Sequence, residues 1–119
     1  MRYVDGFVLA IPKKKFKAYT VMAKFGAKLW RRHGAVDYWE AVSDDVSAKG
    51  AVSFPRSVKL KRGEVVVLSC IEFKSRAHRD QVNKKVMNDP QMKKYMDNKN
   101  MPFDMKRMLY GGFKAFVSQ

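Results

Sequence analysis

The sequence of 119 residues contains one cysteine, Cys70, and two histidines, His33 and His78. A single cysteine excludes an internal disulfide framework and a cysteine-based zinc cluster. The two histidines have no acidic or cysteine partners at metal-ligand spacing, so no metal site is predicted. No cofactor is expected either.

Long apolar runs are also missing. No stretch approaches the roughly 18–20 apolar residues that a membrane-spanning helix needs. The first five residues include charges and are not followed by a cleavage site of small residues, so a secretory signal is not expected. The length favours a single domain over residues 1–119 with a core of its own, and a cytoplasmic location is expected.

Acidic residues are scarce, because 11 of them face 25 basic residues and leave a formal net charge of +14. Residues 1–34 hold nine basic side chains and one acid, Asp5. The positive electrostatic field of such a chain attracts phosphate backbones and anionic surfaces. The ordinary interpretation is a set of lysines on solvated helix faces. The alternative is a basic module that binds RNA, DNA or another polyanion without sequence preference.

The hydrophobic pattern predicts four main strands, at residues 3–11, 35–42, 64–73 and 107–117, and a short extra strand at 57–60. Helices are predicted over residues 13–33 and from Ser75 to about Met87, with a further short helix from Pro90. The order β-α-β-β-α-β is that of a ferredoxin-like α+β fold. In this fold a four-stranded antiparallel sheet carries both helices on one face.

The strand predicted at residues 3–11 is apolar almost throughout, which indicates that both of its faces are covered. Two helices on one side of the sheet cannot cover the other side. A second copy of the chain, related by a two-fold axis, is the simplest source of cover. The sequence therefore predicts a homodimer whose two sheets face each other.

Several short segments, taken together, form a specific sequence signature. They are Tyr3-Val-Asp-Gly-Phe7, Ala77-His-Arg-Asp80, Val86-Met-Asn-Asp-Pro90, Met101-Pro-Phe-Asp104 and Tyr110-Gly-Gly-Phe113. These segments, which span essentially the whole chain, resemble the signature of the DUF1428 family of small bacterial proteins of unknown function. The resemblance implies a dimeric α+β barrel and no particular activity. The chain departs from the family pattern at Cys70, where tryptophan is favoured, and at Met105, where glycine is favoured.

Two carboxylates, Glu40 and Glu72, lie on predicted strands and are candidate catalytic bases. A carboxylate directed into a partly apolar cavity has its pKa raised by desolvation, which suits a general base. The alternative is a strand carboxylate paired with a lysine or an arginine. Tyr38 and Cys70 are candidates for lining the same pocket, although Cys70 is also explained as a small buried filler.

A second candidate site precedes the last predicted strand. Asp104, Arg107 and Tyr110 lie close together in the sequence and could clamp an anion through the planar fork of arginine. Asp104 and Arg107 could equally pair with each other to fix the loop. Asp5, a charge inside an apolar strand, is expected to pair with Lys106 or Arg107 on the neighbouring terminal strand.

His33 is the last candidate ligand-binding residue, because imidazole titrates near neutral pH. Its place before Gly34, at the end of a predicted helix, also has a structural explanation as a C-terminal cap. Taken together, the sequence predicts a dimeric small-molecule-binding protein. A cofactor-independent enzyme that uses strand carboxylates is one form of this function, and the basic polyanion-binding module is the alternative.

Overall fold

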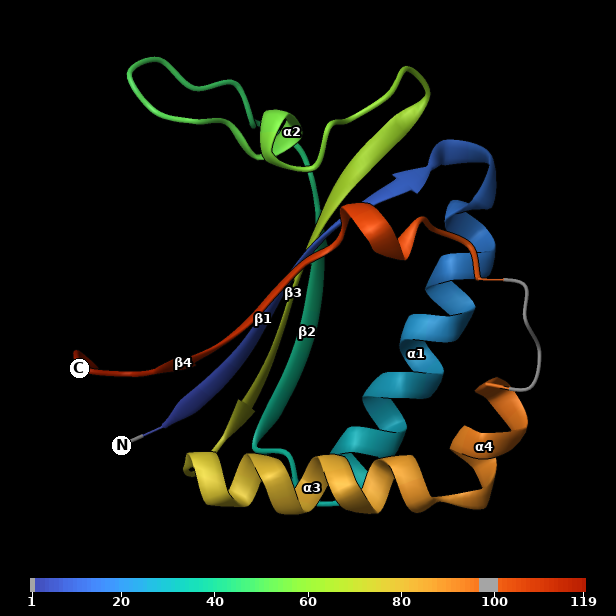
Figure 1. The fold of residues 1–119 in the computed structure, drawn as a ribbon, viewed down its shortest axis with the longest axis vertical. Helices are drawn as coiled ribbons and strands as arrows, with labels where there is room; N and C mark the ends of the chain where they lie inside the picture. Colours follow the sequence, from blue (N-terminus) through green and yellow to red (C-terminus); the bar gives the residue numbers. More distant parts are fainter. Residues whose placement is uncertain (1, 97–100) are drawn as a thin grey trace.

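The computed structural model describes residues 2–96 and 101–119 (Figure 1). The main elements in chain order are β1 (Tyr3–Pro12), α1 (Phe16–Arg32), β2 (Asp37–Val42), α2 (Phe54–Ser57), β3 (Glu64–Phe73), α3 (Arg76–Asn88), α4 (Pro90–Met96) and β4 (Leu109–Lys114). Short 3₁₀ helices at Lys13–Lys15 and Met105–Arg107 precede α1 and β4. The order of elements agrees with the predicted β-α-β-β-α-β pattern, and α4 confirms the short helix predicted from Pro90, whereas α2 was not predicted.

The four strands form one antiparallel sheet in the order β2-β3-β1-β4. The central strands β1 and β3 pair along ten residues each, from Tyr3 opposite Phe73 to Pro12 opposite Glu64. Both are rich in the β-branched residues that favour a pleated, buried surface. The first and last strands of the chain are neighbours, because β4 pairs with β1.

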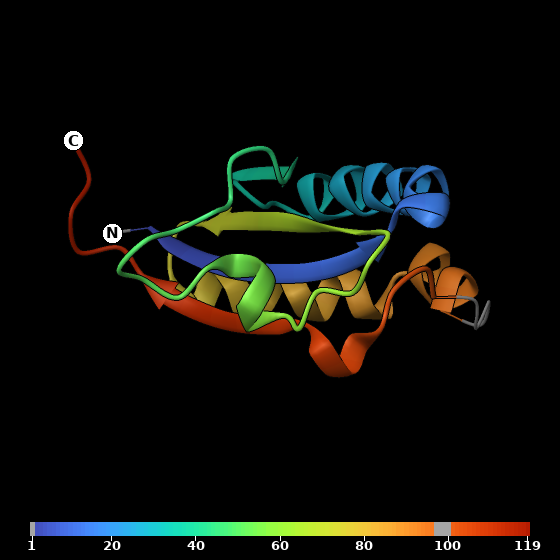
Figure 2. The same cartoon turned by 90° about the horizontal axis from the view of Figure 1, so that it is seen from above.

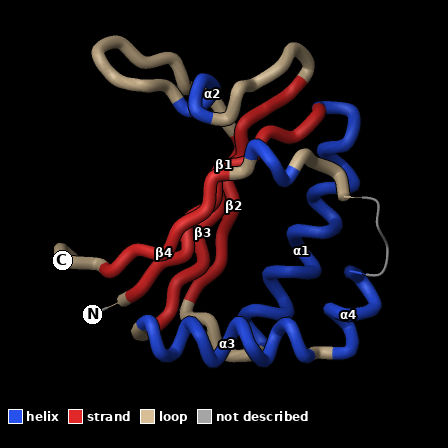
Figure 3. Tube along the Cα trace, in the orientation of Figure 1, coloured by secondary structure: helices blue, strands red, loops and turns tan. Residues whose placement is uncertain are grey.

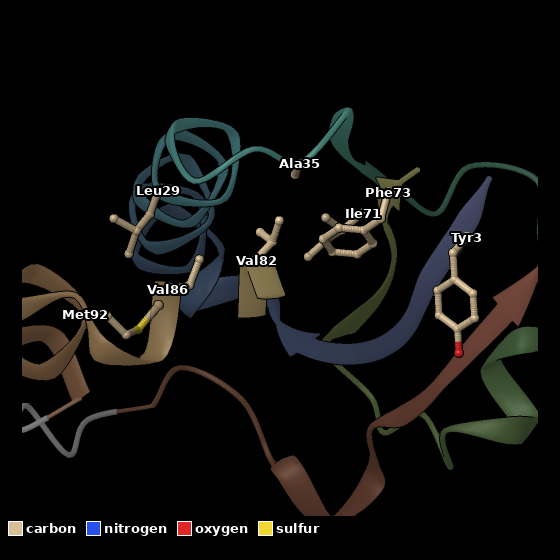
Figure 4. Packing of buried hydrophobic residues seen from close by; sticks show 8 residues of the cluster. All are labelled: Tyr3, Leu29, Ala35, Ile71, Phe73, Val82, Val86 and Met92. Atoms are coloured by element: carbon tan, nitrogen blue, oxygen red, sulfur yellow. The ribbon is translucent and has the colours of Figure 1, made fainter. Parts of the chain in front are cut away.

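One face of this sheet, called the helix face below, is covered by α1 and α3, and α4 lies beside these helices (Figures 1 and 3). Figure 4 shows this core cluster, in which Val82 of α3 lies beside Ile71 and Phe73 of β3, and Val86 lies between Leu29 of α1 and Met92 of α4. Strand alternation sends every second side chain to this face. The register therefore places Tyr38 and Glu40 of β2 on the helix face, opposite Ile71 and Ser69 of β3.

Helix α1 begins after Pro12, which ends β1, and a single 3₁₀ turn leads into it. At its other end His33 is the C-cap, and Gly34 follows with a φ of 116°. Glycine adopts this left-handed conformation without the steric cost that a β-carbon would add. The predicted stop at His33 and Gly34 is confirmed.

Part of the opposite face, called the open face below, is covered by α2 and the residues after it (Figure 2). Val58 is fully buried there against Val8, Ala10 and Val66. The short strand predicted at residues 57–60 is wrong. Ser53 accepts a hydrogen bond from the amide of Arg56, and Pro55 occupies the first turn, so the segment starts a helix instead.

Strand β4 is shorter than predicted. Asp104 accepts a hydrogen bond from the amide of Lys106 at 3.0 Å and thereby caps the 3₁₀ turn, which delays the strand until Leu109. Its glycines have a packing reason, because a β-carbon on Gly112 would lie 2.2 Å from the Tyr3 hydroxyl. The ring of Tyr3 therefore requires glycine beside it.

No helix among the described residues is long and apolar enough to cross a membrane.

Candidate functional site

A cavity of about 360 Å³ lies between α1 and β2 on the helix face. Most of its lining is apolar. The polar or charged side chains in the lining are those of Tyr19, Thr20, Lys24, Tyr38 and Glu40. A mainly apolar cavity with a few convergent polar groups is the usual form of a small-molecule site.

Glu40 is at the centre of the polar part of this cavity. Its Oε1 accepts a hydrogen bond from the Tyr19 hydroxyl, and its Oε2 accepts one from the Tyr38 hydroxyl at 2.6 Å. Tyr38 reaches the carboxylate because it lies two residues away on the same face of β2. Tyr19 comes from α1 and is buried. One carboxylate is thus held between two tyrosine hydroxyls from different elements.

Both tyrosines are strongly held in the protonated form. Burial raises the pKa of Tyr19, and the hydrogen bond to Glu40 and its negative charge raise it further. The pKa of Tyr38 is raised in the same way, by burial first and then by the charge and the hydrogen bond of Glu40. The hydroxyls therefore act as donors, and the carboxylate acts as the acceptor of the cluster.

Space for the cluster depends on Gly26, a buried residue in the middle of α1. A β-carbon at this position would lie 3.3 Å from the Tyr38 hydroxyl. From the sequence, Tyr19 was one of several aromatics that could line a pocket but are more often core residues, and neither Gly26 nor Lys24 was predicted for the site. A glycine inside a strongly helical segment was the one available signal, since glycine is unfavourable there without a packing reason.

The other predicted catalytic carboxylate, Glu72, does not join this cluster. Glu72 pairs with Asp37 and Val4 and lies on the open face, where Arg2 contacts it at 3.5 Å. The sheet therefore separates it from Glu40, and the two carboxylates cannot act on one ligand within a single chain.

Cys70 shares the open face with Glu72. It lies opposite Trp39 on β2 and Gly6 on β1, and it is partly exposed. Burial, and then the charge of Glu72, raise the pKa of its thiol. The thiolate that a nucleophile needs is thus disfavoured.

Arg107 has its donors directed at protein groups. Its two terminal nitrogens bind Glu64 at 2.9 and 2.7 Å, and its Nε donates to Asp104 at 3.2 Å. It also donates to the carbonyl of Lys59 at 3.1 Å. The Arg107 guanidinium lowers the pKa of Glu64 to about 2. This arrangement agrees with the loop-fixing alternative and leaves little of the guanidinium for a ligand.

Tyr110, whose side chain is exposed, joins a network under α3 that reaches the buried carboxylate of Asp5. Arg79 binds Asp5 at 2.8 Å and donates to the Tyr110 hydroxyl at 3.0 Å, and it lies over the ring of Tyr3. Burial raises the pKa of Asp5, although Arg79 opposes the rise. The prediction that Asp5 pairs with Lys106 or Arg107 is wrong. The carboxylate of Asp5 pairs instead with Arg79 of α3.

His33 lies away from the cavity and binds Asp89 at 2.7 Å, which ties the end of α1 to the start of α4. The negative charge of Asp89 is itself stabilised, because the hydrogen bond from His33 lowers its pKa. Within residues 2–96 and 101–119, no group of three or more His, Cys, Asp or Glu side chains is arranged to hold a metal ion.

Comparison with known proteins gives family relatives of the same length. The family model described as "Protein of unknown function (DUF1428)" matches residues 2–105. The "Uncharacterized protein YbaA" of Escherichia coli K12 is 43% identical over 119 residues, which cover 100% of both chains. The protein of the same name from Shigella flexneri is equally similar. Among solved structures, "De novo designed protein Foldit4" covers 97% of this chain and 99% of its own, at 10% identity and a TM-score of 0.46.

Proposed function

This chain belongs to the DUF1428 family of proteins of unknown function, and we propose that it binds a small organic molecule in the cavity between α1 and β2. In this proposal Glu40 accepts a hydrogen bond, or a proton, from the bound molecule. The observation that carries the proposal is the Glu40 carboxylate, held by Tyr19 and Tyr38 at the wall of a mainly apolar cavity.

The chemistry of the cluster favours an acceptor role. A partly buried carboxylate needs hydrogen-bond donors, and the two hydroxyls supply them. Each carboxylate oxygen has further lone-pair sites, so a ligand can add a donor without displacing a tyrosine. A proton-abstracting enzyme that works without a cofactor needs such a fixed carboxylate beside an apolar substrate site.

The proposal is tested by a fragment screen that compares the wild-type protein with two variants. Glu40→Gln keeps the shape of the side chain and removes its charge. Glu72→Gln makes the same change on the open face and is the matched control. Fragments that donate a hydrogen bond are expected to bind Glu40→Gln about tenfold more weakly and Glu72→Gln unchanged, since a hydrogen bond to a charged group contributes about 1.5–3 kcal/mol. Equal affinities for all three proteins would refute the role of Glu40.

We also propose that the open face joins a second copy, giving the homodimeric ferredoxin-like barrel expected from the sequence. Large apolar side chains on this face are exposed in the single chain, among them Trp39 at 41%, Leu109 at 43% and Phe113 at 63%. The ring of Phe113 lies over Gly6 and Gly111, which makes that part of the surface apolar. An apolar sheet face of this kind is typical of a subunit interface.

Sedimentation equilibrium of the wild-type protein tests the homodimer. A dimer is expected at micromolar concentration, and Phe113→Lys is expected to shift it to monomer. Met87→Lys is the control, because Met87 is an exposed apolar residue on α3, away from the open face. A wild-type protein that stays monomeric would exclude this interface.

A second candidate function is the binding of a polyanion through the basic residues around α1. Lys13–Lys15 and α1 contain no acidic residue. None of the described lysines forms an ion pair with a carboxylate of the described residues. Retention on heparin that falls log-linearly with salt would support this function. Elution below physiological ionic strength would remove it.

A further inference from the structure

The cavity wall that α1 forms includes one basic side chain, Lys24. Lys24 lines the cavity and is exposed to solvent, so its ammonium group is at the rim. Lys17 is two helical turns before Lys24, and Lys28 is one turn after it. Arg31 follows Lys28 by three residues and donates to the carbonyl of Ala35 at 3.1 Å, in the connection between α1 and β2.

No acidic residue balances this charge along the chain, since residues 6–36 contain neither Asp nor Glu. Among residues 2–96 and 101–119, no carboxylate pairs with Lys24. The one carboxylate of the cavity lining, Glu40, already accepts hydrogen bonds from two tyrosines. The cavity thus has a satisfied anion in its wall and a cation at its rim that is free to bind a counter-charge.

We propose that the molecule bound in this cavity is an organic anion with an apolar body, and that Lys24 binds its carboxylate, sulfonate or phosphate group. The apolar body fills the space lined by residues such as Ala23, Ala27 and Val67. A hydroxyl or other donor on the molecule points to Glu40. This inference rests on the proposed function, and it adds the chemical class of the ligand and the residue that selects it.

Electrostatics favour this class over neutral or cationic molecules. A net charge of +14 raises the local concentration of small anions, and the row of Lys17, Lys24 and Lys28 concentrates the field at the rim. Lysine suits a rim position because its apolar stem can lie along the cavity wall while its ammonium stays in water.

Two fluorescent probes with the same apolar body test the inference. The anion is 8-anilinonaphthalene-1-sulfonate, and the neutral analogue is N-phenyl-1-naphthylamine, which lacks the sulfonate. Their dissociation constants are measured for the wild-type protein, for Lys24→Gln and for Lys14→Gln at 50 mM salt. Lys14→Gln is the matched control, because it removes one charge from an exposed lysine outside the cavity lining.

The wild-type protein and Lys14→Gln are expected to bind the anionic probe more tightly than the neutral probe. In Lys24→Gln the ratio of the two dissociation constants is expected to decrease by about three- to fivefold, because one exposed ion pair is lost. The preference should also decrease at 500 mM salt. A ratio that is the same in Lys24→Gln and Lys14→Gln would overturn the inference.

Ala27→Phe, which fills the cavity, separates this outcome from failure of the proposed function. Suppose that Ala27→Phe blocks both probes, but the ratio of their dissociation constants is the same in Lys24→Gln and Lys14→Gln. The cavity then binds small molecules but does not select anions. If Ala27→Phe leaves the binding of both probes unchanged, they do not enter the cavity. The proposed function and the inference that rests on it would then both be wrong.

Discussion

The Tyr38 hydroxyl lies 3.3 Å from the point that a β-carbon on Gly26 would occupy. Gly26 is inside α1, where glycine destabilises a helix by about 1 kcal/mol relative to alanine. The hydroxyl cannot easily move aside, because it is 2.6 Å from Glu40. The helix thus contains an unfavourable residue at the position where a tyrosine of the site approaches it.

The effect of Gly26→Ala on the free energy of unfolding is expected to change sign with the residue at position 38. In the wild-type background the new methyl group crowds the Tyr38 hydroxyl, so we expect a destabilisation of about 1 kcal/mol. In a Tyr38→Phe background the crowding atom is gone, and the same change should stabilise by about 0.5–1 kcal/mol. Urea unfolding of the four proteins in this cycle measures the coupling. Equal effects in both backgrounds would show that Gly26 does not serve Tyr38.

Tyr38 should also make the protein sensitive to alkali. Its native pKa is raised above the ordinary value of about 10, so the unfolded chain releases this proton first and unfolding becomes easier as pH rises. The stability of the wild-type protein relative to Tyr38→Phe is expected to fall by about 1.4 kcal/mol per pH unit above pH 10. Urea unfolding of both proteins between pH 9 and 11 measures this difference. A constant difference across that range would contradict it.

Glu64 and Arg107 should control the response to acid. The native pKa of Glu64 is about 2, below its ordinary value of 4.5, so the stabilisation is complete above pH 4.5 and is lost as the pH falls towards 2. Arg107→Met is expected to destabilise the protein at pH 7, because it leaves the Glu64 carboxylate without its bidentate partner. The loss should shrink on acidification, as followed by urea unfolding from pH 7 to 2. An undiminished loss at pH 2 would rule out this pair as its source.

Arg79→Gln is expected to destabilise by about 3–5 kcal/mol at pH 7, because the Asp5 side chain it leaves behind is 2% exposed. Burial already raises the pKa of Asp5, and loss of Arg79 raises it further, so the native variant takes up a proton more readily than the unfolded chain. The variant should therefore gain stability as the pH is lowered from 8 towards 5. Asp5→Asn added to Arg79→Gln should restore part of the loss at pH 8. A double variant no more stable than Arg79→Gln would mean that the buried charge is not the cause.

Local patterns predicted most of the fold. The apolar stripe of α1, the β-branched centre of β3 and the caps at Ser75 and Gly34 are short-range signals, and the structure has elements at each of them. The error at residues 57–60 also has a local cause. Ser53 and Pro55 start a helix just before this segment, and these local signals point away from a strand.

The candidate site was only partly predictable, because it joins residues that are distant in the sequence. Alternation along β2 placed Tyr38 and Glu40 on one face, as the register shows. The contact between Tyr19 and Glu40 spans 21 residues and depends on how α1 packs on the sheet. The separation of Glu40 from Glu72 depends on strand register, which the composition of the strands does not specify.

The pairing of β4 with β1 has a consequence for how the chain reaches its native state. This pairing joins residues about a hundred positions apart in the sequence, such as Val4 and Phe113. Until β4 is synthesised, the outer edge of β1 exposes unpaired backbone groups that can recruit other strands. Nascent or truncated chains that end before Leu109 should therefore be prone to aggregation, and completion of folding must wait for β4 to leave the ribosome.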